Sequence, residues 1–176
     1  MGTYVAFLRG INLGPTRKVD MAGLKAVTEG LGYTDVWTYL NTGNVGLSTD
    51  QDPTTVEQEL AAALQQAYGA RIDVTVRSAD ELRAVLAANP YPDESSSKVT
   101  VAFLCGAARP DAQERVAATA TPAEPFTFSG REVWVCYGDG QARSKLAAGF
   151  SRVVGVSATV RTVGTVSKIV GRLDGS

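Results

Sequence analysis

The sequence predicts an α+β fold made of two tandem ferredoxin-like subdomains, each with the element order β-α-β-β-α-β. Alternating apolar residues and helical spacing follow one another in this order across residues 3–77. The same order recurs across residues 99–173, where residues 101–104 repeat the letters VAFL of residues 5–8. We therefore expect two antiparallel sheets, each with helices on one face.

In the first half, helix and turn signals separate the apolar runs. Asp20 is the expected N-cap of the first helix, and Asp52 with Pro53 begins the second. Thr42-Gly43 is the expected turn of a hairpin. The predicted elements are a strand at 3–8, a helix at 21–31, strands at 36–40 and 45–47, a helix at 53–68 and a strand at 72–76.

A capping box formed by Ser78 and Glu81 predicts a linking helix that stops at Asn89-Pro90. Residues 90–98 resemble a linker, so we place the domains at 1–89 and 90–176. The predicted elements beyond the linker are a strand at 99–104, a helix at 110–118, a hairpin of 125–128 and 132–137, a short helix at 141–149, a strand at 157–161 and a helix at 163–173.

Composition excludes several kinds of chemistry. The chain has 176 residues, a formal net charge of −1 and no histidine, so a Ser-His-Asp or Cys-His mechanism and any histidine metal site are excluded. Its two cysteines, Cys105 and Cys136, lie in apolar runs and are expected to be buried free thiols. Few cysteines and no predicted signal peptide or membrane span indicate a cytoplasmic protein.

One group of polar residues is expected at the end of the first strand. The β-α-β-β-α-β topology brings this strand end close to the hairpin turn, which places Arg9 and Asn12 near Asn44. A guanidinium group, side-chain amides and exposed backbone N–H groups suit an anion or the edge of a nucleotide. Asn and Gly residues also serve tight turns, and Arg9 has Asp20 and Asp35 as alternative partners.

A second group of candidate residues lies in the C-terminal fifth of the chain. Residues 138–146 place two glycines before a predicted helix start that contains Ser144 and Lys145, a pattern typical of phosphate-binding loops and of ordinary helix caps alike. Residues 140–176 contain six basic side chains, Arg161 and Lys168 among them, and one acidic side chain. Such a segment favours an anionic partner or a solvated helix face.

These patterns lead to a binding hypothesis with two alternatives. The leading hypothesis is a protein that binds an anionic small molecule, such as a nucleotide, or a nucleic acid. A histidine-free enzyme that uses arginine, lysine or carboxylate groups and a protein–protein interaction module are the alternatives. No metal, cofactor or membrane partner is predicted, and the oligomeric state stays open. The candidate ligand-binding residues are Arg9, Asn12, Asn44, Ser144, Lys145, Arg161 and Lys168.

Several segments resemble one bacterial family. Residues 4–14 (YVAFLRGINLG) and 38–45 (TYLNTGNV), together with Asn89-Pro90-Tyr91 and Ser144-Lys145-Leu146, are similar to motifs of the domain-of-unknown-function 1697 family. The resemblance spans nearly the whole chain and implies two tandem ferredoxin-like subdomains. It implies no activity.

The chain departs from the family pattern at two places. Pro15 stands where the family commonly has a second glycine, and the Asn and Trp of the family's C-terminal motif are missing from residues 161–169. If the Asn and Trp build a site in relatives, we expect that site to be altered or absent here.

Overall fold

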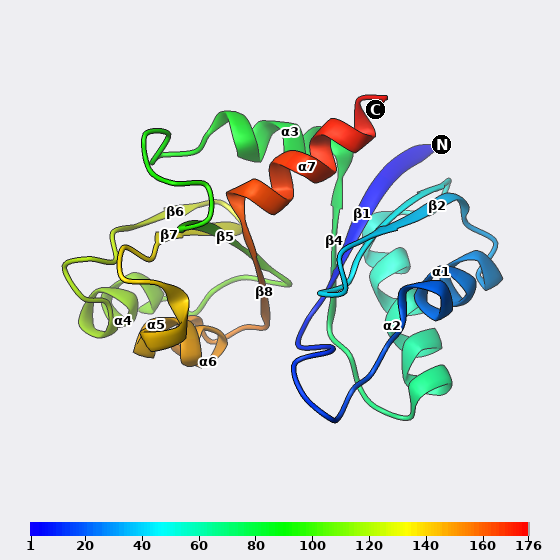
Figure 1. The fold of residues 1–176 in the computed structure, drawn as a ribbon, viewed down its shortest axis with the longest axis horizontal. Helices are drawn as coiled ribbons and strands as arrows, with labels where there is room; N and C mark the ends of the chain where they lie inside the picture. The colour runs from blue at the N-terminus through cyan, green and yellow to red at the C-terminus, as the bar shows by residue number, and fades with distance from the viewer. Residues whose placement is uncertain (176) are drawn as a thin grey trace. The chain divides into compact units, whose positions relative to one another are not determined.

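A computed structural model describes residues 1–175 of the chain (Figure 1). It divides into two compact units, Met1–Leu82 and Arg83–Ser176, which we describe separately. The chain passes from one unit to the other within α3 (Ala79–Ala87), and the division that the sequence predicts between residues 89 and 90 stays a prediction. Within residues 1–175, no helix combines the length and the hydropathy needed to cross a bilayer.

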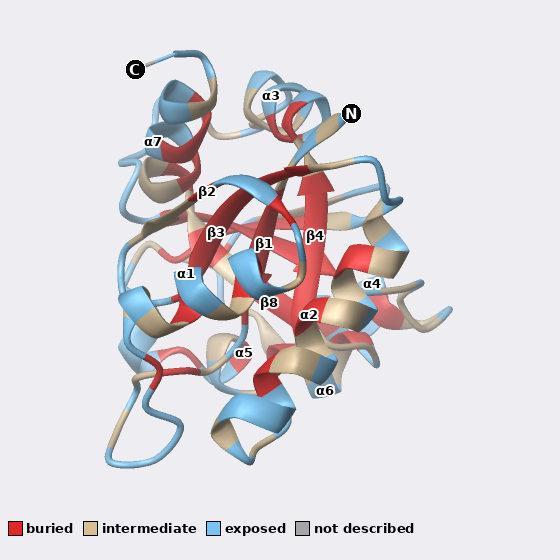
Figure 2. Cartoon of the chain, turned by 90° about the vertical axis from the view of Figure 1, so that its right-hand side faces the viewer, coloured by how far each residue is buried: buried red, intermediate tan, exposed pale blue. Residues whose placement is uncertain are grey.

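The first unit has the predicted ferredoxin-like topology, with four antiparallel strands in the order β2-β3-β1-β4. Helices α1 and α2 lie in front of the buried strands of this sheet in Figure 2. The bounds are β1 Gly2–Leu8, α1 Met21–Gly30, β2 Thr34–Tyr39, β3 Asn44–Thr49, α2 Pro53–Tyr68 and β4 Val74–Ser78.

Strand β1 lies at the centre of the first sheet because it pairs with β3 on one edge and β4 on the other. Its side chains alternate between the two faces, so Ala6 and Leu8 join Leu24 and Leu60 in the core beneath the helices. Asp20 and Asp52 cap α1 and α2 as predicted, since each carboxylate accepts a backbone N–H of its first turn.

The second unit repeats this arrangement in a sheet of order β6-β7-β5-β8, again with antiparallel neighbours. Strand β5 is central, and Ala102 and Leu104 face a core that includes Val116, Phe150 and Val154. The bounds are β5 Val99–Leu104, α4 Ala112–Thr119, β6 Phe126–Ser129, β7 Glu132–Cys136, α5 Lys145–Ala148, α6 Phe150–Val154, β8 Ala158–Thr162 and α7 Val163–Leu173.

Two expectations for the second unit are wrong. The helix predicted at 141–149 is a 3₁₀ turn (Gln141–Arg143) followed by α5 and α6, because Ser144 caps α5 and Gly149 separates the two short helices. Of the two cysteines expected to be buried, Cys136 is buried and Cys105 is exposed. Cys105 follows the last residue of β5, where the chain leaves the sheet.

Gly43 holds the β2–β3 turn against the end of β1. Its φ is +92°, its carbonyl accepts the N–H of Leu8 at 2.9 Å, and a Cβ added to it would lie 2.8 Å from both Leu8 Cβ and Ile11 Cδ1. Gly32 has a similar φ of +87° but open space around its Cα. A comparison of alanine substitutions at the two glycines therefore distinguishes the energetic cost of the left-handed backbone from the cost of the steric clash.

We expect Gly43→Ala to lower the free energy of unfolding by about 2–4 kcal/mol, since a left-handed backbone and a steric clash both oppose it. Gly32→Ala should cost about 1–2 kcal/mol, because it meets the conformational penalty alone. Urea denaturation of both variants measures the difference. Equal destabilisation would show that the close packing at Gly43 contributes nothing.

Candidate functional site

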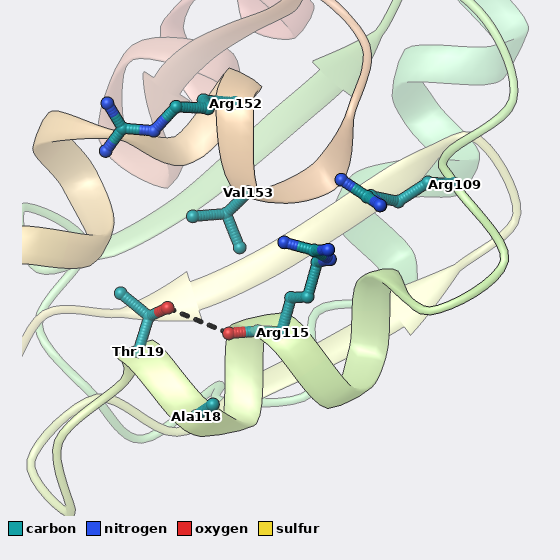
Figure 3. A pocket seen from close by; sticks show the side chains of 6 residues that line it. All are labelled: Arg109, Arg115, Ala118, Thr119, Arg152 and Val153. Atoms are coloured by element: carbon teal, nitrogen blue, oxygen red, sulfur yellow. Dashed lines mark hydrogen bonds between the residues drawn. The ribbon is translucent and has the colours of Figure 1, made fainter.

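A pocket of about 300 Å³ opens between α4 and α6 of the second unit (Figure 3). Three of its lining side chains are cationic, two are small and apolar, and one is a threonine. They are Arg109, Arg115, Arg152, Ala118, Val153 and Thr119. One part of the pocket wall therefore carries arginine side chains, and another part is apolar.

One carboxylate holds two of the arginines together. Asp111 accepts the Nε–H of Arg109 at 2.5 Å through Oδ1 and the Nε–H of Arg115 at 2.8 Å through Oδ2. The hydrogen bonds from Arg115 and then Arg109 hold the pKa of Asp111 below its usual range, so this carboxylate is ionised at neutral pH. Two positive charges and one negative charge leave this cluster with a net charge of +1.

The terminal nitrogens of both guanidinium groups remain available to a ligand. Among residues 1–175, the side-chain hydrogen bonds of Arg109 and Arg115 all run from Nε to Asp111. A guanidinium group carries five N–H donors in a planar fork, so four of the five on each arginine have no acceptor among residues 1–175. These donors suit a carboxylate or phosphate group, which accepts paired N–H groups.

Glycines at both ends of α6 make room for the arginine side chains. Arg109 donates its backbone N–H to Val154 at 2.9 Å, and a Cβ on Gly155 would lie 3.0 Å from Arg109 Cδ. A Cβ on Gly149 would lie 2.8 Å from Arg152 Nη2. Within the described residues, the exposed Arg152 side chain makes no hydrogen bond or ion pair.

The remaining wall is fixed by α4 and α6. Val153 packs against the core of the second unit, and its side chain lies between Arg152 and the other two arginines in Figure 3. The hydroxyl of Thr119 donates to the carbonyl of Arg115 at 2.8 Å, as the dashed line shows. Val153 is thus held by packing, and Thr119 is held by a local hydrogen bond.

The predicted residues of the first unit support its loops. Asn12 Nδ2 donates to the carbonyls of Val19 and Asn41 at 2.8 Å each, which ties the loop after β1 to the hairpin turn. Asn44 is fully buried, and its Nδ2 donates to the carbonyl of Tyr39 at 2.7 Å. The topology therefore brings these residues to one end of the sheet as predicted, and their amides make hydrogen bonds inside the protein.

Arg9 forms an ion pair with a carboxylate other than the two expected from the sequence. Its Nη1 lies 3.5 Å from Asp73 Oδ2, so neither Asp20 nor Asp35 is the partner in this ion pair. The Arg9 side chain is 44% exposed and keeps part of its surface open to solvent. A ligand role for Arg9 stays a prediction.

The predicted residues of the second unit lie on three elements: Ser144 and Lys145 at the start of α5, Arg161 on β8 and Lys168 on α7. Ser144 caps α5, accepts the N–H of Ala147 at 3.0 Å and donates its hydroxyl to buried Glu124 at 2.7 Å. Lys145 and Lys168 are exposed on α5 and α7. Arg161 is buried on β8, where burial lowers its pKa to about 10, so it keeps its charge at neutral pH.

Sequence reasoning missed the three arginines of the pocket. Arg115 follows Asp111 at the i+4 spacing of a helical ion pair, and Arg109 precedes Asp111 by two residues. That Arg-x-Asp-x-x-x-Arg spacing is a usable signal for a shared carboxylate. Arg152 carries no comparable local signal, because α6 comes close to α4 only through tertiary packing.

The fold and the pocket define a class: an α+β protein with two four-stranded antiparallel sheets and an arginine-lined pocket in the second unit. A family model described as a protein of unknown function, DUF1697, matches residues 1–134, and the chain belongs to this family. The match includes Arg109 and Arg115 and ends before Arg152.

A solved structure shares the fold. The conserved bacterial protein SP0830 from Streptococcus pneumoniae is 19% identical and superimposes with a TM-score of 0.77, and the match covers 97% of each chain. Among curated proteins, none matches the chain. At this level of identity, the solved structure supports the fold and carries no activity across.

Ser144→Ala tests whether Ser144 has a structural role or a binding role. We expect a loss of about 1–3 kcal/mol in the free energy of unfolding, because the change removes a helix cap and a hydrogen-bond donor to buried Glu124. Urea denaturation measures the loss, and any affinity for sulfate, used as a tetrahedral probe of an anion site, should stay unchanged. If the variant keeps its stability but loses sulfate binding, Ser144 has the ligand-binding role that the sequence predicts.

Proposed function

We propose that this protein binds a small anionic molecule in the pocket between α4 and α6. The observation that carries the proposal is the pair formed by Arg109 and Arg115, whose terminal guanidinium nitrogens have no acceptor among the described residues. Two adjacent guanidinium groups repel each other, and the one carboxylate between them compensates half of their charge. An anion that accepts from the terminal nitrogens supplies the rest.

The size of the pocket favours a small molecule over a polymer. A volume of about 300 Å³ lies at the lower end of the range typical of small-molecule sites. Apolar Val153 and Ala118 beside the arginines suit a ligand that has a carbon skeleton as well as a charged group. Of the two ligand classes in the leading sequence hypothesis, we therefore choose the small molecule.

The residues that the sequence singled out define a competing place for the anion. At the end of β1, the partly exposed side chain of Arg9 follows the strand at the start of the loop that Asn12 organises. We keep this position as the alternative site of the same function. A substitution in each unit separates the two positions.

We also propose that the two units arose by internal duplication. The letters Thr-Val-Arg occur at 75–77 in β4 and at 159–161 in β8. In the strand register, Arg77 lies opposite Val5 and Arg161 lies opposite Val101. Each arginine is therefore paired with the first residue of a VAFL segment. Each also donates an Nη1 hydrogen bond to the carbonyl of its preceding residue at 3.0 Å.

We also propose that the protein is located in the cytoplasm. The support for this location is the low cysteine content alone.

Sulfate binding to Arg115→Gln tests the proposed site. Sulfate is a tetrahedral anion that accepts several N–H groups, and isothermal titration at constant ionic strength measures its affinity. We expect a loss of roughly tenfold to a hundredfold, because one or two charge-assisted hydrogen bonds disappear. Arg143→Gln is the matched control, since this exposed arginine of the same unit does not line the pocket.

Arg9→Gln distinguishes the competing position. We expect its sulfate affinity to equal that of the unchanged protein. A loss in Arg9→Gln without a loss in Arg115→Gln would place the anion at the end of β1 and overturn the pocket assignment. Equal losses in Arg115→Gln and Arg143→Gln would indicate a diffuse charge effect with no specific site.

Sulfate affinity should stay flat between pH 5.5 and 8.5. The charged groups of the site are three arginines and Asp111, whose pKa lies below its usual range, and the chain has no histidine. The charge of Asp111 is lost only as the pH falls through that lowered pKa, so no group of the site titrates within this window. A step in affinity near pH 6.5 would show that another titrating group controls binding.

A further inference from the structure

We infer that the ligand of this pocket carries two separated anionic groups, as a short linear dicarboxylate does. One group would bind the Arg109–Arg115 pair, and the other would bind Arg152. This inference rests on the proposed function, because it specifies the chemical class of the anion in the same pocket.

The two cationic groups lie toward opposite ends of α6. The stem of Arg109 packs against Gly155, which follows the helix, whereas the guanidinium of Arg152 packs against Gly149, which precedes it. Helical side chains lean toward the N-terminus, which explains why Arg152 reaches back to Gly149. Figure 3 shows Arg109 and Arg115 on one side of Val153 and the guanidinium of Arg152 on the other.

The length of α6 sets the scale of the separation. The helix has five residues, Phe150–Val154, and a rise of about 1.5 Å per residue makes it roughly 7 Å long. A compact ion such as sulfate is too small to engage both ends at once. A chain of two to four methylene groups between two carboxylates spans a distance of this order.

The charges at the two ends are matched. Arg109 and Arg115 share Asp111, so their end has a net charge of +1. Arg152 supplies +1 at the other end and has no acidic partner among the described residues. A dianion with one charge at each end neutralises both ends, while a monoanion leaves one guanidinium group without a partner.

The surface between the two ends is apolar. Val153 lies between the cationic groups, and Ala118 lines the same pocket from α4. An aliphatic spacer buries apolar surface against these side chains at no hydrogen-bonding cost. A spacer rich in hydroxyl groups would find one side-chain hydroxyl in the lining, that of Thr119.

The test compares ligands that differ in the number and the spacing of their charges. Isothermal titration at constant ionic strength would measure butyrate, succinate, glutarate, adipate and sulfate against the whole protein. We expect the best dicarboxylate to bind at least about tenfold tighter than both butyrate and sulfate, because the second contact forms within one complex. Sulfate has two charges without separation, so it controls for charge alone.

Arg152→Gln separates this inference from the proposed function. In this variant the advantage of the dicarboxylate over butyrate should fall to about twofold or less. Arg115→Gln should weaken butyrate and dicarboxylate alike, and Arg143→Gln should change neither.

Each other result has one meaning. Equal affinity for butyrate and the dicarboxylates in the unchanged protein would overturn the inference and leave the proposed function standing. An undiminished dicarboxylate advantage in Arg152→Gln would also overturn it, by removing Arg152 from the second contact. No measurable binding of any of the five anions would overturn the proposed function as well.

Discussion

Each unit depends on the pairing of its central strand on both edges. Strands β1 and β5 have antiparallel neighbours on either side, so their backbone groups are satisfied within the sheet and their side chains are free to be apolar on both faces. The sequence VAFL meets this requirement twice. The register of a buried strand fixes which of its side chains face the helices. It therefore also fixes the position at which the loop after each central strand leaves the sheet.

The fold was predictable because local and long-range signals agree. Helix caps, turn glycines and alternating apolar residues all indicate the same element order, and the order itself specifies the strand arrangement. The prediction of one helix at 141–149 failed because Ser144 begins α5 and Gly149 separates α5 from α6. The apolar residues of this segment have helical spacing, which hides both boundaries. It failed for Cys105 because burial ends where a strand ends, and apolar neighbours do not reveal that position.

The candidate site was less predictable, since residue type does not reveal whether a polar group is already satisfied. Asn12 and Ser144 have the donors and acceptors that a ligand needs, but their partners are carbonyls and a carboxylate of the protein itself. The reverse holds for Arg115. On a helix surface it looks like half of an ordinary i,i+4 ion pair, and its role in the pocket depends on a second arginine that shares the same carboxylate.

Asn12 of the predicted site and Arg109 of the pocket occupy equivalent places in the two units, because each follows the end of a VAFL strand and precedes the next helix. In the first unit this loop is long, and the side-chain amide of Asn12 holds it to the hairpin turn by hydrogen bonds. In the second unit the loop is short, and Arg109 lies close enough to α4 to share Asp111 with Arg115. The loop length thus determines whether this position needs a side chain for its own stability or can present one to a ligand. The same strand end is thus a structural connection in the first unit, and under the proposed function it contributes a ligand-binding side chain in the second. The strand order of the supporting sheet is the same in both units.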